Sequence, residues 1–581
     1  MRVPYPRTPH LPWSPGASAD DVRAGSLAGL AGREVVVTEK LDGENTTLYA
    51  DGLHARSLDS AHHPSRAWIK ALHGRIARLI PPGTRVCGEN MYARHSLPYD
   101  RLESWFYAFS VWDGDRCLDW DATVRFARRL GVPVPPVLWR GTFDERALRA
   151  LRLDTARQEG YVVRTVEGFG RQEFADRVAK WVRRGHVRTD EHWMLAPVVE
   201  NGLSPAAALW EARSGGAPDV AALLAALGLE EPATPVDRAE AALADVLPRL
   251  DLLGRSGDGR LAGVLAAVLH ADHRPTLTPR LVEPLGMPLA RRVADLVGLH
   301  TRLHREFPDG ERRAGLVRMT AAADLGVLHA VAASALAGRD DPDATAAREE
   351  TAWSELNADD AGLLDEDPLG FLRAGMREAL ADQEPEVADR CWAEAREAFA
   401  RGRVATVDAA LALTWRWRSD DFPRLLVMVG PSGSGKSHFA REYDDIEVRL
   451  SLDDLREARG SRADQRANPQ VLTDALDALT KALDEVLTVS WDATCLNPRQ
   501  RSLVHAVAER CDALTTHAVM VVPEEVVAER NVRRDHPVPP EVLAAQYRRY
   551  VPPYPGEAHR TWYVGPEGTV LDVAGGLDED Q

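Results

Sequence analysis

The segment 425–437 constrains the fold of this chain more than any other. Five consecutive apolar residues, Leu425 to Val429, are typical of a strand buried on both faces. They run directly into Gly430-Pro431-Ser432-Gly433-Ser434-Gly435-Lys436-Ser437, and a helical pattern follows. Glycines let backbone N–H groups turn inward and surround phosphate at the start of a helix. Strand, loop and helix in this order predict a parallel α/β domain with a phosphate-binding loop, or P-loop.

The residues of this loop have separate expected roles. Lys436 is expected to reach the β- and γ-phosphates of a nucleotide, and Ser437 to ligate Mg²⁺. The other phosphate contacts are expected around Gly430, Ser432, Gly433, Ser434 and Gly435. The pattern is specific because the strand, the loop and the helix must all be present.

Three further segments follow the loop in a fixed order. They are Ser451-Leu452-Asp453-Asp454-Leu455-Arg456 after an expected strand, Asp492-Ala493-Thr494 after a second strand (Leu487 to Trp491), and Glu529 to Arg534. Together with the P-loop they resemble the polynucleotide 5′-kinase family over nearly the whole of this domain. The resemblance implies that Asp453 accepts the proton of a 5′-hydroxyl and that Arg456 binds the acceptor's phosphate. It also implies that Arg530 and Arg534 form a lid over the donor phosphates.

Two carboxylates of this region have a structural alternative. Asp453, or Asp454 beside it, could cap a helix that begins near Leu455 instead of serving as a base. Asp492 could be a second-shell or a structural carboxylate.

A second feature lies near the other end of the chain. Glu39-Lys40-Leu41-Asp42-Gly43-Glu44-Asn45-Thr46 follows the apolar run Val35 to Val37 and precedes the alternating run Leu48 to Ala50. A lysine between two strands, beside an aspartate and a glycine, suits an amine that loses its proton and acts as a nucleophile. Taken alone, the segment favours a surface hairpin that carries ordinary charges, and the motifs that follow it in order are what favour the nucleophile.

Further segments follow that lysine in order. They are Arg56, Cys87-Gly88-Glu89-Asn90, the aromatic strand Trp105 to Trp112, Glu159-Gly160-Tyr161-Val162 and Val178-Ala179-Lys180-Trp181-Val182. In this order they resemble the covalent nucleotidyltransferases, specifically the ATP-dependent RNA ligases, over roughly the first third of the chain.

This resemblance implies a role for each matched residue. Lys40, within the Glu39 to Gly43 motif, attacks the α-phosphate of ATP and holds AMP as a lysyl phosphoramidate. Asp42 and Arg56 hold the ribose and the incoming end, Glu89 contacts the ribose, and Phe109 (or Tyr107) stacks on adenine. Glu159 binds the metal and Lys180 neutralises the α-phosphate. We expect Lys180 and Mg²⁺ to depress the pKa of Lys40.

For two features at the motif Val178 to Val182, the sequence alone does not decide the role. Relatives often carry two lysines in this motif, and Val182 holds the second position here, which leaves Lys180 as the lysine of this motif. The stretch Arg183 to Arg188 is either a phosphate track for nucleic acid or a solvated basic turn.

Between these regions the composition shifts to Ala, Leu, Arg, Asp and Glu with helical periodicity, which predicts an all-helical module. His270, Asp272, His273, His300, His304 and Asp324 vaguely resemble the metal ligands of an HD-type phosphohydrolase. The family's His-Asp pair is His270-Ala271 here, so the bridging aspartate is missing. The alternatives are an active metal site, a degenerate HD-like module or a helical spacer.

The whole chain of 581 residues is therefore expected to be multidomain, mixing α+β and α/β parts. We place a nucleotidyltransferase domain of ATP-grasp-like mixed β type at 1–195, the helical module at 196–418 and a P-loop kinase domain at 419–581. A net charge of −17 argues against non-specific coating of nucleic acid but allows a local basic groove. Scattered cysteines, no signal peptide and no membrane span favour the cytoplasm.

Together the two resemblances favour an RNA end-repair enzyme. The kinase would phosphorylate a 5′-hydroxyl with ATP or another nucleoside triphosphate, and the ligase would join that 5′-phosphate to a 3′-hydroxyl with Mg²⁺ or Mn²⁺. Broken tRNA is one candidate substrate. The alternatives are AMP transfer to an acceptor other than nucleic acid, with a kinase of unrelated substrate, and a damage sensor that uses ATP as a switch.

Overall fold

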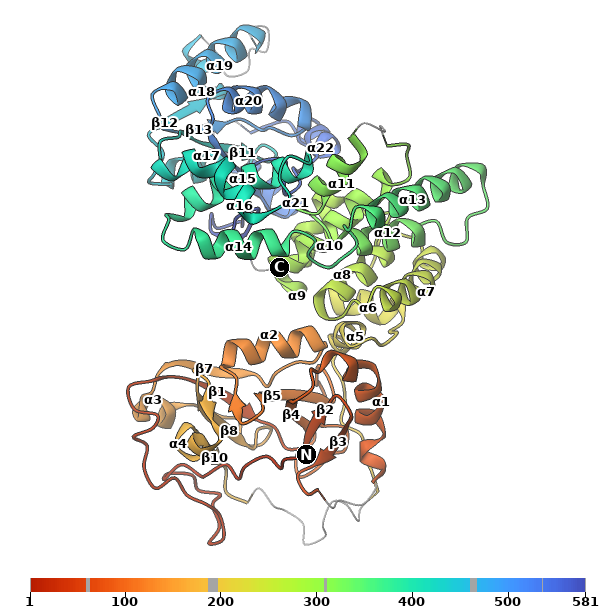
Figure 1. Ribbon diagram of the computed structural model, residues 1–581, viewed down its shortest axis with the longest axis vertical. Coiled ribbons are helices and arrows are strands. Elements are labelled where there is room, and N and C mark those ends of the chain that lie inside the picture. The colour runs from red at the N-terminus through yellow and green to blue at the C-terminus, as the bar shows by residue number, and fades with distance from the viewer. Residues whose placement is uncertain are drawn as a thin grey trace. The chain divides into compact units, whose positions relative to one another are not determined.

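The computed structural model describes residues 2–58, 63–185, 197–307, 311–459, 468–534 and 537–579. The chain forms two compact units (Figure 1). The first comprises Met1–Glu230 with Gly254–Leu261, and the second Glu231–Leu253 with Ala262–Gln581. In the described part of the chain, no helix has both the length and the apolar character needed to cross a membrane.

Two antiparallel sheets form the centre of the first unit. One has the order β10-β8-β1-β7 and the other β3-β2-β4-β5-β6-β9. The strands of the first sheet are β1 (Glu34–Lys40), β7 (Val137–Thr142), β8 (Gly160–Thr165) and β10 (Val178–Val182). Those of the second are β2 (Glu44–Tyr49), β3 (Gly52–Ala55), β4 (Thr84–Asn90), β5 (Phe106–Asp113), β6 (Arg116–Cys117) and β9 (Phe169–Gly170).

Helices α1 (Ala67–Ile76) and α2 (Trp120–Leu130) pack on the second of these sheets. Helix α2 begins where Asp119 accepts a hydrogen bond from the backbone N–H of Ala122 at 2.6 Å, and it ends at Gly131, whose φ of 77° lies in the left-handed region. The apolar faces of the two helices meet the β2, β4 and β5 side chains in one buried cluster. The shorter helices are α3 (Glu145–Ala150), α4 (Phe174–Arg177), α5 (Ala207–Arg213) and α6 (Val220–Leu227). The mixed α/β class predicted for this part is confirmed.

A long helical region follows, as predicted. Its helices are α7 (Val236–Leu252), α8 (Gly257–Val268), α9 (Arg274–Leu285), α10 (Met287–Leu299), α11 (Arg312–Met319), α12 (Leu325–Ser334), α13 (Pro342–Asp360), α14 (Gly370–Ala379), α15 (Pro385–Ala400) and α16 (Val407–Thr414). The 3₁₀ helix η7 (Trp415–Ser419) closes the region.

A six-stranded sheet with the order β12-β13-β11-β14-β15-β16 ends the second unit. Its first five strands are parallel, and β16 pairs antiparallel with β15. The strands are β11 (Arg424–Val429), β12 (Val448–Ser451), β13 (Thr488–Asp492), β14 (Leu514–Met520), β15 (Arg560–Val564) and β16 (Val570–Ala574). The helices are α17 (Lys436–Glu442), α18 (Leu452–Ala458), α19 (Asn468–Asp484), α20 (Pro498–Arg510), α21 (Glu524–Val532) and α22 (Pro540–Arg549).

Both faces of this sheet are buried. Leu425, Val427 and Val429 belong to one apolar cluster and Leu426 and Met428 to another, because alternate side chains of a strand point to opposite faces. The uninterrupted apolar run of the sequence therefore has the predicted cause, a central parallel strand covered on both sides.

The helical region and this sheet share buried ion pairs within the second unit. Arg274 of α9 pairs with Asp295 of α10 at 2.6 Å and donates to the carbonyls of Pro552 at 2.6 Å and Pro553 at 2.9 Å. Arg291 of α10 pairs with Asp572 of β16 at 2.9 Å. Because a buried charge needs all its partners, these contacts join the helices firmly to the P-loop domain.

Candidate active sites

A cavity of about 170 Å³ in the first unit is lined by side chains from both antiparallel sheets. It contains most residues that the sequence assigned to nucleotide binding: Glu39, Lys40, Arg56, Glu89, Phe109 and Lys180. Lys40 is the last residue of β1 and is paired in register with Gly160 of β8, so Glu159 lies beside it. Segments far apart in the sequence thus converge because β1, β8 and β10 are neighbours in one sheet.

Lys40 is ion-paired with Glu159. The carboxylate of Glu159 raises the pKa of Lys40 against the opposing effect of burial. The depressed pKa expected for Lys40 is therefore not met in this arrangement, because the acidic neighbours, Glu159 first, outweigh burial. For Lys180 itself, burial and the nearby Lys40 lower the pKa.

Glu89 lies on β4 and accepts a hydrogen bond from the backbone N–H of Gly43 at 3.2 Å. Burial, reinforced by Glu159, raises its pKa to about 7, against the opposing effect of Lys40. Gly43 has no room for a side chain, since an added Cβ would lie 2.5 Å from the carbonyl oxygen of Asn90. The glycine of the lysine motif is therefore required by the close approach of β4.

The carboxylate of Asp42 accepts hydrogen bonds within the protein. Its Oδ2 accepts hydrogen bonds from the Ser96 N–H at 2.9 Å, the Ser96 hydroxyl at 2.8 Å and the Leu97 N–H at 3.0 Å. These bonds hold the loop at 96–97, and Asp42 is not among the residues that line the cavity. Glu39 accepts from Gln158 at 2.9 Å, and Arg56 is exposed at the cavity.

The two candidates for stacking on adenine, Phe109 and Tyr107, lie in different surroundings. Phe109 lines the cavity, whereas Tyr107 is buried with Leu41, Met91 and Leu102. Tyr5 meets Phe109 edge-on, with ring centroids 5.1 Å apart. Tyr5, Pro6 and Thr8 also line the cavity, a contribution of the N-terminal segment that sequence reasoning missed. Pairing of His10 with Lys180 could not be read from the sequence, and it is this pairing that brings the segment to β10.

The P-loop lies where its pattern predicted, between β11 and α17. Gly435 precedes α17 with a φ of 101°, in the left-handed region that favours glycine. Lys436 donates to the carbonyl of Pro431 at 2.7 Å, and burial lowers the pKa of Lys436 to about 8. Ser432 is bonded to Gln546 of α22 through both its N–H (2.8 Å) and its hydroxyl (3.0 Å), so a distant helix fixes the shape of the loop.

Ser437 donates to Asp492, the last residue of β13, at 3.0 Å. Arg449 of β12 binds the other carboxylate oxygen of Asp492 at 3.0 Å. Serine and carboxylate oxygens are the ligands that Mg²⁺ prefers, and P-loop proteins hold the ion with such a pair. The structure places Asp492 at this position because β13 is the neighbour of β11, which the sequence could not show.

Asp453 lies in the first turn of α18 and is not its cap. The hydroxyl of Ser451 accepts from the Asp454 N–H at 3.3 Å and caps the helix. The capping alternative for Asp453 and Asp454 is therefore wrong, because the helix begins earlier than the sequence suggested. Asp453 is 62% exposed and pairs with Arg456 at 2.5 Å. Asp454 pairs instead with Arg449.

The two lid arginines are placed differently. Arg530 lies on α21 and donates to the Pro566 carbonyl at 2.7 Å, with its guanidinium beside Gly435 of the P-loop. Arg534 contributes to lowering the pKa of Lys436, although less than burial does. Both arginines are therefore near the loop that they were expected to cover.

The histidines of the helical region bind backbone carbonyls. His270 contacts Ala267, His300 contacts Val297 and His304 contacts Ala332, each at 2.8 Å. Asp324 caps α12, and Asp272 accepts from Ala233 and Thr234. Within the described ranges no group of three or more His, Cys, Asp or Glu side chains is arranged to hold a metal ion.

The basic stretch after β10 lies partly outside the described residues, which end at 185 and resume at 197. His186, Val187 and Arg188 are in that gap. Arg183 is buried, at 6% exposed, so it is not a solvated residue.

Two segments of the chain match known family models. Residues 33–182 match the family model described as RNA ligase, and residues 425–553 match a model described as AAA domain. A search of curated proteins finds no match.

Several solved structures are similar to parts of the chain. A structure of the Pnkp1/Rnl/Hen1 RNA repair complex is 27% identical, over 22% of this chain and 44% of that one, with a TM-score of 0.20. An RNA ligase from Naegleria gruberi with ATP and Mn is 17% identical, over 27% and 51%, with a TM-score of 0.21. A sugar kinase from Janibacter sp. is 19% identical, over 25% and 86%, with a TM-score of 0.20. The chain thus spans about half the length of the repair-complex and ligase chains.

The matched segments define the class of this protein. It is a multidomain protein with a mixed α/β N-terminal domain, a helical middle region and a C-terminal P-loop-like domain. The N-terminal module is an RNA-ligase-type domain, and the C-terminal module is a P-loop domain of kinase-like type.

Proposed function

We propose that this chain is an RNA repair enzyme that phosphorylates a 5′-hydroxyl end and then seals it to a 3′-hydroxyl end. The observation that supports this best is the presence of two complementary sites in one chain. One presents a cavity lysine, Lys40, beside two carboxylates, and the other presents a P-loop whose Ser437 contacts Asp492. The product of the second site is the substrate of the first.

The ligase site would act through Lys40 as the nucleophile toward the α-phosphate of ATP, forming a P–N bond to AMP while the bond to the β-phosphate breaks and pyrophosphate leaves. The amine must leave Glu159 and lose its proton before it can attack. Phe109 lines the cavity and would stack on the base, while Lys180 would stabilise charge on the α-phosphate. The buried carboxylates Glu159 and Glu89 would hold Mg²⁺ or Mn²⁺, which bind oxygen ligands and would neutralise the phosphates.

The kinase site would use Asp453 as the base. Its carboxylate is exposed, so an acceptor hydroxyl can reach it, and Arg456 beside it would bind the acceptor's phosphate. Lys436, Arg530 and Arg534 would stabilise the transferring phosphoryl group, and Ser437 with Asp492 would hold the divalent ion.

The test incubates purified protein with α-labelled ATP, a divalent ion and a nicked RNA stem-loop that bears 5′-hydroxyl and 3′-hydroxyl ends. We expect labelled protein and a sealed product. Lys40→Ala should abolish protein labelling but leave 5′-phosphorylation intact, and Lys436→Ala should do the reverse. Exposed Lys70 and Lys481 provide matched Ala controls in the two modules.

Two results would contradict the proposal. Protein labelling without sealing, even on a pre-phosphorylated nick, would point to another AMP acceptor. No label on the protein would remove the ligase half and leave the kinase alone. A DNA nick of the same sequence separates RNA from DNA as the preferred substrate.

A further inference from the structure

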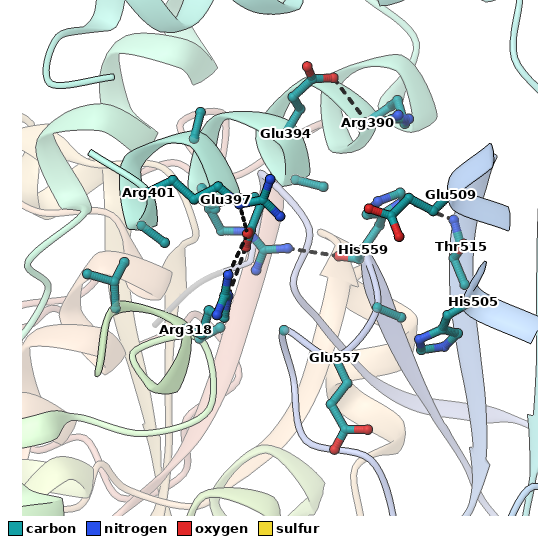
Figure 2. A pocket seen from close by; sticks show the side chains of 18 of the residues that line it. Arg318, Arg390, Glu394, Glu397, Arg401, His505, Glu509, Thr515, Glu557 and His559 are labelled. Carbon is teal, nitrogen blue, oxygen red and sulfur yellow. Dashed lines mark hydrogen bonds and ion pairs between the residues drawn. The ribbon is translucent and has the colours of Figure 1, made fainter. Parts of the chain in front are cut away.

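The largest cavity described in the second unit lies apart from the P-loop. It has a volume of about 430 Å³ and lies between α11, α15 and α16 on one side and α20, β14 and the segment 556–559 on the other (Figure 2). Its volume is within the range of about 300–1,000 Å³ that ligand sites occupy. The cavity is therefore large enough for a nucleotide.

This junction cavity lies at the opposite edge of the sheet from the kinase site. Thr515, which lines it, is at the amino end of β14, whereas the P-loop follows the carboxyl end of the parallel neighbour β11. Strand β14 spans Leu514–Met520, so the two edges are about 20 Å apart. A ligand here would not occupy the phosphoryl-transfer site.

The lining is rich in arginine. Six arginines and five acidic residues line the cavity, in a chain whose net charge is −17. Figure 2 shows Arg318 and Arg401 converging on Glu397, at 2.7 Å and 2.6 Å. A second acidic residue of the lining, Glu557, is bound by Arg501 at 2.8 Å. Most carboxylates of the lining are therefore already neutralised.

Two lining arginines lack a carboxylate partner. Among the described residues Arg403 is exposed and makes no ion pair, and Arg396 donates only to the His559 carbonyl at 3.0 Å. The Nε of Arg396 is buried without a hydrogen-bond partner. Guanidinium groups held in this way are suited to binding phosphate.

An exposed aromatic side chain lies between two residues of the cavity lining in the sequence. Trp415 of η7 is 70% exposed, and its neighbours Leu413 and Arg416 line the cavity. Trp417 is buried between the guanidinium groups of Arg390 and Arg416, 3.8 Å and 3.9 Å from its ring centroid. In a 3₁₀ helix, residues two positions apart point in different directions. The burial of Trp417 therefore orients η7 so that the Trp415 side chain points to solvent.

We propose that this junction cavity and Trp415 form a binding site for single-stranded RNA, separate from both catalytic sites. Trp415 stacks on a base while Arg403 and Arg396 bind neighbouring phosphates, which is how single-strand sites combine aromatic platforms with cations. The choice of RNA among polyanions rests on the proposed function. The site holds the RNA strand during end repair without taking part in the chemistry.

The test measures binding of a fluorescein-labelled, 12-nucleotide single-stranded RNA to the full chain by anisotropy. Trp415→Ala should weaken binding about fivefold or more, as loss of one stacked base does. Arg403→Ala should weaken binding at low salt and reduce the slope of log K against log salt by about 0.7. Trp353→Ala and Arg280→Ala remove an exposed tryptophan and an exposed arginine elsewhere in the same unit, and should bind as the unchanged protein does.

Phosphorylation of a dinucleotide with a 5′-hydroxyl should stay within twofold in both variants, since so short an acceptor does not reach the junction cavity. Equal RNA affinity for Trp415→Ala and Trp353→Ala would overturn this site and leave the proposed function intact. Weaker RNA binding by Trp415→Ala in a protein that seals no ends would defeat the proposed function and support the site.

Discussion

The Arg274–Asp295 pair makes a sharp prediction about the helical region. Arg274→Met should strongly destabilise the second unit and reduce kinase activity on heating, although Arg274 lies far along the chain from the P-loop. Both side chains are buried, at 7% and 1% exposed, and Arg274 also donates to the carbonyls of Pro552 and Pro553. The methionine would leave one carboxylate and two carbonyls without their donor.

The size of the effect follows from these contacts. Breaking one partner of a buried ion pair costs about 3–5 kcal/mol, because the remaining charge stays buried. The cost is large for Asp295 because its Oδ2 already lacks a hydrogen-bond partner. Burial also raises the pKa of Asp295 despite the nearby Arg274 and Arg291. A loss of about 4 kcal/mol corresponds to a fall in Tm of roughly 5 °C in a unit of this size.

Scanning calorimetry of the full chain, with kinase activity measured after heating, would test this prediction. Asp295→Asn should cost less, about 1–2 kcal/mol, because Arg274 keeps its two carbonyl partners. Exposed Arg280 on the same helix gives the control, Arg280→Met, which should change Tm by less than about 1 °C. If Arg274→Met changed Tm no more than that control, the pair would not join the helices to the kinase sheet.

Three further predictions concern the sites and the pH dependence of stability. Asp492→Asn should raise the Mg²⁺ concentration for half-maximal phosphorylation about 10- to 100-fold, since Asp492 contacts Ser437 in the P-loop. AMP transfer to the protein should stay unchanged. An unchanged Mg²⁺ titration of phosphorylation would contradict this prediction. Phe109→Ala should raise the KM for ATP in protein labelling about tenfold through lost stacking. Tyr107→Phe should leave that KM unchanged, because Tyr107 does not line the cavity and its hydroxyl accepts from the Glu103 N–H at 2.8 Å. Stability against urea should fall by about 2 kcal/mol between pH 7 and pH 5, because burial lowers the pKa of His300 to about 4. Below about pH 6.5 the imidazole takes up a proton in the unfolded chain but not in the folded one. A flat profile would refute this prediction.

The residues that sequence reasoning found are those whose role depends on local order. The P-loop needs a strand before it and a helix after it, and all three parts are adjacent in the chain. Lys40, Glu89 and Lys180 were found because each sits in a short motif and the motifs come in a fixed order. The cavity that they share with Phe109 confirms that the strands bring them together.

The residues that it missed depend on which strands are neighbours. Asp492 meets Ser437 only because β13 lies beside β11, and Tyr5 reaches the ligase cavity only because His10 pairs with Lys180. For Asp42, in contrast, the sequence predicted a contact that the structure does not show. Its motif position implied contact with the ribose, yet its carboxylate holds the loop at Ser96, a bond that no spacing rule reveals.

The reactive groups expected in both modules share one property, which is an internal partner. Lys40 is bound by Glu159, Lys436 by the Pro431 carbonyl, and Asp453 by Arg456. A buried or half-buried polar group without a partner is costly, so the contacts of Lys40 and Lys436 stabilise the fold. The pair made by the exposed Asp453 contributes little. In the proposed reactions a substrate atom would replace each of these contacts, so the first contact with substrate would be an exchange of partners. Since an exchange recovers most of the lost hydrogen-bond energy, nucleotide binding can reorganise each site at small net cost.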